Sequence, residues 1–103
     1  MKKIYLICAA GLSTSMMVEK MKQAAKKEGF ECAIQAVGIQ MAESIVPEAD
    51  CILLGPQIRF EKDNVSKIAG DVPVAVIDMK DYGRMNGAAV VKQAQELMAQ
   101  AGR

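Results

Sequence analysis

The 103-residue chain alternates short apolar runs with longer stretches whose apolar residues recur at helical spacing. Four of the apolar runs are bounded by turn or polar residues, which predicts buried strands at 3–8, 32–37, 51–54 and 74–77. The other spacing predicts a helix that follows Cys8 and ends at Gly29, and further helices at 40–46, 58–69 and 88–99. We expect residues 78–87 to form a loop.

This order of strands and helices predicts one α/β domain over residues 1–103, with an open four-stranded parallel sheet and helices on both faces. Ligands of such sheets bind beyond the carboxyl ends of the strands. Cys8, residues 55–57 and residues 78–87 are expected at that edge. Cys32 and Cys51 begin their strands, so we expect them at the opposite edge.

Composition excludes several kinds of function. The net charge of +1 gives no support for nucleic-acid binding, and the apolar runs are too short to cross a bilayer. We therefore expect a cytoplasmic protein without direct membrane insertion. Three widely spaced cysteines argue against disulfides and zinc, and we expect no metal and no cofactor. Because there is no histidine, no Cys–His or Ser–His–Asp system can form within this chain.

The segment after the first strand has the composition of a phosphoryl-binding loop. Cys8 is followed by Ala9, Ala10, Gly11, Leu12, Ser13, Thr14 and Ser15, and then by a helical pattern. Small residues allow the backbone to approach a ligand, and loop amides with a helix N-terminus attract an anion and favour a thiolate. We predict that Cys8 is the catalytic nucleophile and that residues 9–15 bind the phosphoryl group. Ser13 and Thr14 are candidate N-caps. The alternative is a buried cysteine in a non-catalytic interaction module.

The spacing of this loop also resembles low-molecular-weight tyrosine phosphatases, in which five residues separate the cysteine from an arginine and a serine or threonine. Here Thr14 stands at the arginine position and Ser15 follows it. The arginine clamps the phosphoryl group with two hydrogen bonds. Asp78 or Asp81 could serve as the general acid of such an enzyme. Without the arginine, the loop suits storage of a phosphocysteine better than its hydrolysis, and the phosphatase stays as an alternative.

A more specific resemblance covers essentially the whole chain. Ile-Tyr-Leu-Ile-Cys-Ala-Ala-Gly-Leu-Ser-Thr-Ser at 4–15, Leu-Leu-Gly-Pro-Gln-Ile at 53–58 and Tyr-Gly-Arg-Met-Asn-Gly at 82–87 resemble the IIB component of the sugar phosphotransferase system, lactose/cellobiose type. The resemblance implies a phosphotransferase in which Cys8 takes a phosphoryl group from a histidine of the IIA protein. The group would pass to a sugar, such as cellobiose, chitobiose or lactose, bound by the membrane IIC permease.

Several residues at the expected ligand edge are candidates for contact with these partners. They follow the third and fourth strands: Pro56, Gln57, Arg59, Tyr82 and Arg84. Methionines outside the predicted core are further candidates, because flexible thioether side chains adapt to binding surfaces. These are Met16, Met41, Met79 and Met85.

Overall fold

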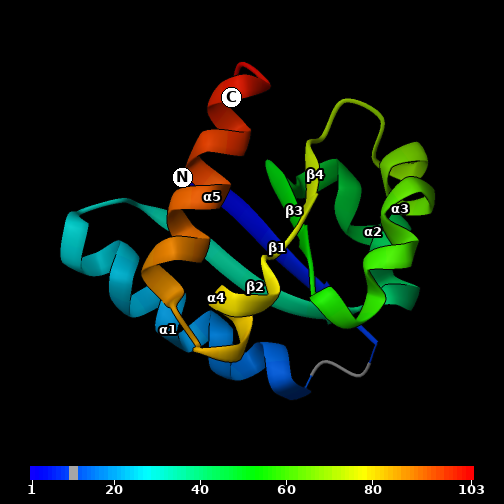
Figure 1. The fold of residues 1–103 in the computed structure, drawn as a ribbon. Helices are drawn as coiled ribbons and strands as arrows, with labels where there is room; N and C mark the ends of the chain where they lie inside the picture. Colours follow the sequence, from blue (N-terminus) through cyan, green and yellow to red (C-terminus); the bar gives the residue numbers. More distant parts are fainter. Residues whose placement is uncertain (10–11) are drawn as a thin grey trace.

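The structure is a computed structural model, and it describes residues 1–9 and 12–103, with side chains except at 12 and 13 (Figure 1). The sheet has four parallel strands in the order β2-β1-β3-β4. Their bounds are β1 Lys2–Cys8, β2 Cys32–Gly38, β3 Cys51–Leu54 and β4 Val74–Val76. The predicted open parallel sheet is confirmed. In this order the switch point lies between β1 and β3, where ligands of such folds bind.

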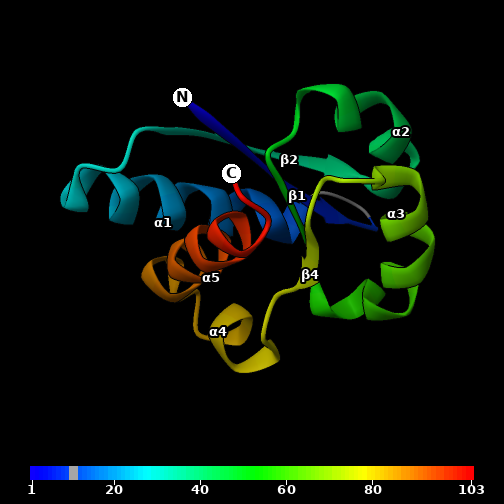
Figure 2. The same ribbon diagram turned by 90° about the horizontal axis from the view of Figure 1, so that it is seen from above.

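Helices cover both faces of the sheet (Figure 2). On one face lie α1 (Leu12–Glu28), α4 (Met79–Gly83) and α5 (Gly87–Gln100), and on the other lie α2 (Ala42–Ile45) and α3 (Lys62–Ala69). Successive residues of a strand point to opposite faces. Ile4 and Leu6 therefore pack under α1 and α5, while Tyr5 and Ile7 pack under α2 and α3. The sheet therefore lies between two aliphatic cores, one on each of its faces.

The long helices bury the faces that their spacing predicts. In α1, Met17, Val18, Met21 and Ala25 are buried against the first core. In α5, the buried side chains are Val90, Val91, Ala94 and Met98. Gly29 follows α1 with φ +72°, a left-handed conformation that glycine adopts without strain. None of the helices in the described part of the chain is long and apolar enough to cross a membrane.

Three local predictions differ in part from the structure. Residues 78–87 are not simply a loop, because Asp78 caps a short helix, α4, by accepting hydrogen bonds from the amides of Lys80 and Asp81. The predicted helix at 58–69 is divided at Ile58–Lys62 into a 3₁₀ segment, η3 (Pro56–Glu61), and α3. The predicted helix at 40–46 is present as α2 but is shorter, because 3₁₀ turns flank it, η1 (Ile39–Met41) and η2 (Val46–Glu48). Such short turns carry too few apolar positions to show a clear period.

Candidate functional site

Cys8 ends β1 at the carboxyl edge of the sheet and is 4% exposed. Its sulfur lies 3.1 Å from the hydroxyl oxygen of Thr14, and either group can donate this hydrogen bond. Thr14 is fully buried. The prediction that Thr14 caps the helix is wrong, because α1 already begins at Leu12. The position that holds the arginine in the phosphatase spacing is therefore occupied by a buried hydroxyl that contacts the cysteine.

The beginning of α1 supplies the other groups expected around Cys8. In any α-helix the first four N–H groups have no carbonyl acceptor within the helix, and they carry its positive dipole end. α1 begins at Leu12, four residues after Cys8, so its positive dipole end follows the cysteine closely in the chain. Ser13 lies inside the first turn and is not the predicted N-cap, while Ser15 and Ala9 are exposed. Ala10 and Gly11 lie outside the described residues.

Gly55, which follows β3, lies directly beside Cys8. Its amide donates a hydrogen bond of 2.9 Å to the carbonyl oxygen of Ile7. A Cβ atom at Gly55 would lie 3.7 Å from the Cβ of Cys8 and 3.0 Å from Oε1 of Gln57. A larger residue would therefore crowd the end of the Gln57 side chain, while its Cβ would be in ordinary contact with Cys8. Glycine here lets the turn after β3 approach the site closely.

A cleft of about 320 Å³ opens between the segments that follow β3 and β4. Its lining consists of Pro56, Gln57, Arg59, Met79, Tyr82 and Gly83. Three of the predicted partner contacts, Gln57, Arg59 and Arg84, are exposed. Pro56 and Tyr82 are buried, and Tyr82 packs into the first core with 6% of its surface exposed. Pro56 and Tyr82 form part of the wall of the cleft. Arg84 is not among its lining residues.

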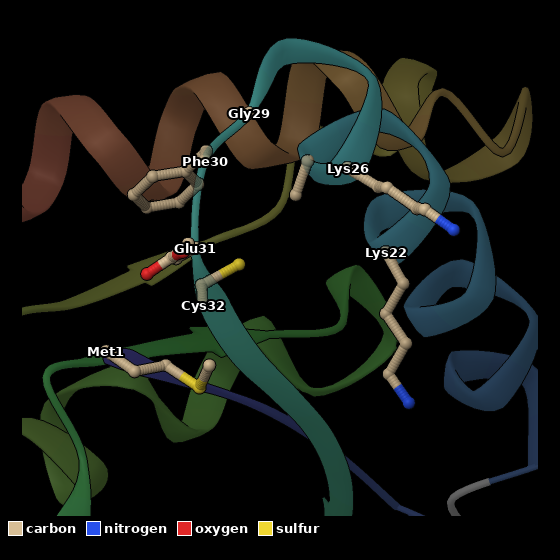
Figure 3. Close-up of a pocket in the computed structure, with 8 residues that line it drawn as sticks. Met1, Lys22, Lys26, Gly29, Phe30, Glu31 and Cys32 are labelled. Carbon is tan, nitrogen blue, oxygen red and sulfur yellow. The ribbon is translucent and has the colours of Figure 1, made fainter.

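The two remaining cysteines lie at the opposite edge, as predicted, because they begin β2 and β3. Burial raises the pKa of Cys51 to about 12, and the charge of Asp50 adds to the shift. Burial also raises the pKa of Cys32, with a further contribution from Glu28. Cys32 lines a cavity of about 330 Å³ with Lys22, Lys26 and Phe30 (Figure 3). Both thiols are therefore held in the neutral form, away from the ligand edge.

The structure gives less support for a phosphatase or for a metal site. The backbone amides of α4 occupy an oxygen of Asp78, the proposed general acid of a phosphatase, through hydrogen bonds of 2.8 and 3.4 Å. Within the described residues, no group of three or more His, Cys, Asp or Glu side chains could hold a metal ion. What the edge does assemble is a cysteine, a buried hydroxyl and a helix N-terminus.

Comparison with known proteins shows the family of the chain. Residues 3–93 match the family described as the lactose/cellobiose-specific IIB subunit of the PTS system. The chain belongs to this family. It is thus a IIB component of a sugar phosphotransferase system, and components of this class are phosphotransferases.

Relatives match over nearly their whole length but carry different sugar names. The oligo-β-mannoside-specific EIIB component of Bacillus subtilis is 44% identical over 95% of this chain and 97% of its own. The galactose-specific EIIB component of Lactococcus lactis is 45% identical over 94% of this chain and 96% of its own. The solution structure of a cellobiose-specific IIB component from Borrelia burgdorferi has a TM-score of 0.81 and 33% identity, and covers 97% of this chain and 94% of its own.

Proposed function

We propose that this IIB component carries a phosphoryl group on Cys8 between a histidine of its IIA protein and a sugar bound by its membrane IIC permease. The observation that carries the proposal is the position of Cys8 at the switch point of the sheet, with the Thr14 hydroxyl 3.1 Å from its sulfur and α1 beginning at Leu12. The protein works in the cytoplasm in this proposal. It supplies the nucleophile, while the histidine that the chain lacks belongs to the donor.

In the first step the Cys8 thiolate attacks the phosphorus of the phosphohistidine. The S–P bond forms as the P–N bond breaks, and the electron pair returns to the imidazole nitrogen. Phosphoryl transfer needs in-line positioning and stabilisation of negative charge on the oxygens. The amides of residues 9–15 supply the hydrogen bonds to these oxygens, assisted by the hydroxyls of Ser13 and Ser15.

In the second step a sugar hydroxyl attacks the phosphorus, the S–P bond breaks and the electron pair returns to sulfur. The hydroxyl proton is released, and the phosphoryl group leaves on the sugar. The Thr14 hydroxyl favours this step by donating to the sulfur as it becomes a thiolate, because hydrogen bonds to charged atoms are stronger than neutral ones. A β-linked disaccharide is the proposed cargo. Since similar chains carry different sugar names, the permease selects the sugar.

The deciding experiment follows the mass of the intact protein after incubation with a IIA protein phosphorylated on histidine. We expect a gain of one phosphoryl group, located on Cys8 and stable for minutes. Cys32→Ser serves as the control, because Cys32 is half-buried at the opposite edge, and this variant should gain the same mass. Cys8→Ser should block phosphorylation of the sugar. If the Cys8→Ser variant still supports it, the proposal is wrong.

A further inference from the structure

The two strands that flank β1 end in the same arrangement of a glycine and a glutamine. β2 ends at Gly38, and Gln40 comes two residues later. Gly55 follows β3, and Gln57 comes two residues after it. In the strand order β2-β1-β3-β4 these strands are the neighbours of β1, so one arrangement lies on each side of Cys8. Each glycine also precedes a 3₁₀ turn, η1 or η3.

Neither glycine is required by its backbone conformation. Gly38 has φ −77° and ψ 160°, and Gly55 has φ −60° and ψ 145°, extended conformations that other residues adopt without strain. What the glycines provide is space, and the glutamine side chains occupy it. A Cβ atom at Gly38 would overlap Oε1 of Gln40 and lie 2.8 Å from its Nε2, and a Cβ atom at Gly55 would lie 3.0 Å from Oε1 of Gln57. Each carboxamide therefore folds back over its glycine, although both glutamines are exposed residues.

Both carboxamides lie on the face of the sheet to which the Cys8 side chain points. Cys8 pairs with Gly38 in the register of β1 and β2, and residues paired in this way direct their Cβ atoms to the same face. On the other side, a Cβ atom at Gly55 would lie 3.7 Å from the Cβ of Cys8. Neighbouring strands are about 5 Å apart, so each glycine lies roughly one strand spacing from the cysteine. A phosphoryl group on the sulfur would thus have a carboxamide on either side.

We infer that Gln40 and Gln57 are further catalytic residues, whose carboxamide N–H groups donate hydrogen bonds to the phosphoryl oxygens as the group moves to and from Cys8. The inference rests on the proposed phosphocarrier function. A carboxamide carries two N–H donors and no charge, and side-chain amides can stabilise negative charge that develops on oxygen in a transition state. The glutamines transfer no proton, so the bonds that form and break are those of the two phosphoryl transfer steps. They approach from the neighbouring strand ends, whereas the amides of α1 approach from the helix.

The test replaces Gln40 and Gln57 one at a time by leucine and by glutamate. Leucine removes the donors, while glutamate keeps the size and shape of the side chain but replaces the donors by a carboxylate. Gln23, an exposed residue of α1 about three turns from its start, receives the same changes as the matched control. The rate of Cys8 phosphorylation is measured against the concentration of phosphorylated IIA protein, and thermal unfolding checks the fold. We expect the leucine variants to lower the rate at saturation about tenfold, with little change in KM. The glutamate variants should be slower still, because a carboxylate repels the phosphoryl oxygens, and the Gln23 variants should behave as wild type.

Gly38→Ala tests the position of the Gln40 carboxamide without changing the glutamine. Alanine fits the extended backbone at this position, but its methyl group takes the space in which the carboxamide lies. We expect this variant to fold and to lower the rate at saturation as Gln40→Leu does. A wild-type rate for Gly38→Ala would overturn the role of Gln40.

The outcomes separate the two proposals. If wild-type protein gains no phosphoryl group on Cys8, the phosphocarrier function fails. If wild type is phosphorylated and the glutamine variants keep its rate at saturation, the catalytic role of the glutamines alone is overturned. A change in KM without a change in that rate overturns it as well, because the side chains then contact a partner protein rather than the phosphoryl group. A normal rate in the glutamate variants would show that only the shape of the side chain matters, and would also overturn it.

Discussion

The hydroxyl oxygen of Thr14 lies 3.1 Å from the sulfur of Cys8, six residues earlier in the chain. Both side chains are buried, so water competes little for this hydrogen bond. The contact joins the last residue of β1 to the first turn of α1. Thr14 also stands at the sequence position that holds the arginine in the phosphatase spacing. One buried hydroxyl thus contacts the proposed nucleophile and stands where the phosphatase spacing has the arginine that promotes hydrolysis.

Thr14→Val is expected to slow phosphoryl uptake by Cys8. Valine keeps the branched shape in a fully buried position but removes the hydroxyl that contacts the sulfur. A hydrogen bond to a charged group contributes about 1.5–3 kcal/mol. Its loss therefore corresponds to a roughly ten- to hundredfold decrease in the rate at which Cys8 is phosphorylated. Thr14→Ser keeps the hydroxyl and should retain most of the rate. The measurement is the rate of Cys8 phosphorylation by the donor, and a wild-type rate for the valine variant would contradict the role of Thr14.

The backbone amides at the start of α1 can be tested through Leu12. Proline is tolerated at the first helical position but has no N–H group. Because α1 begins at Leu12, Leu12→Pro removes one amide donor from the proposed cradle while leaving the helix able to form. We expect a marked decrease in phosphoryl uptake for Leu12→Pro and little change for Leu12→Ala. Circular dichroism confirms that both variants fold, and equal uptake rates would rule out a contribution from this amide.

The sequence predicts the sheet and the position of Cys8 at its edge because both depend on local pattern. Short aliphatic runs identify the four strands, and alternation with helices makes the sheet parallel. Parallel strands bring all their carboxyl ends to one edge, so the place of Cys8 follows from the order of the elements alone. The positions of Cys32 and Cys51 at the other edge follow in the same way.

The side-chain contacts could not be predicted in this way, because they depend on tertiary packing. The composition after Cys8 suggests that Thr14 caps a helix, yet the helix starts two residues earlier and buries the hydroxyl against the sulfur. Tyr82 looks like an exposed aromatic in a loop, but the capped helix α4 turns it into the core. The sequence signal for α4 is Asp78, a residue type that caps helices but is also common in turns.

Gly87→Ala is expected to destabilise the fold at the contact between α1 and α5. A Cβ atom at Gly87 would overlap the carbonyl group of Lys20 and lie 2.7 Å from the amide nitrogen of Met21. These are backbone atoms of a helix, so α5 would have to move away, at a cost of about 1–3 kcal/mol. Gly83→Ala is the control, because a Cβ atom there meets nothing within 4 Å. Urea unfolding of the two variants should differ by that amount, and equal stabilities would contradict the close contact.

The buried thiol of Cys51 should make stability fall in alkaline solution. Burial raises its pKa from 9.0 to about 12 in the folded protein, so the folded state keeps a proton that the unfolded chain loses above about pH 9. The stabilisation is complete below pH 9 and is lost as the pH rises towards 12. A shift of this size corresponds to about 4 kcal/mol. The free energy of unfolding, measured between about pH 8 and pH 11, should decrease less steeply for Cys51→Ala than for wild type.

Phosphorylated wild-type protein is expected to hold its phosphoryl group for minutes or longer in the absence of partners, and to have negligible activity on aryl phosphates. An arginine at position 14 would stabilise the charge of the transition state for transfer to water, but the buried Thr14 has no such group. Thr14→Arg should not create a phosphatase, because a guanidinium cannot enter a fully buried position without unpacking α1 from β1. The lifetime is measured by mass spectrometry after removal of the donor protein. If the phosphoryl group is lost within seconds, or if wild type rapidly turns over an aryl phosphate, the phosphocarrier proposal is wrong and the protein is a hydrolase.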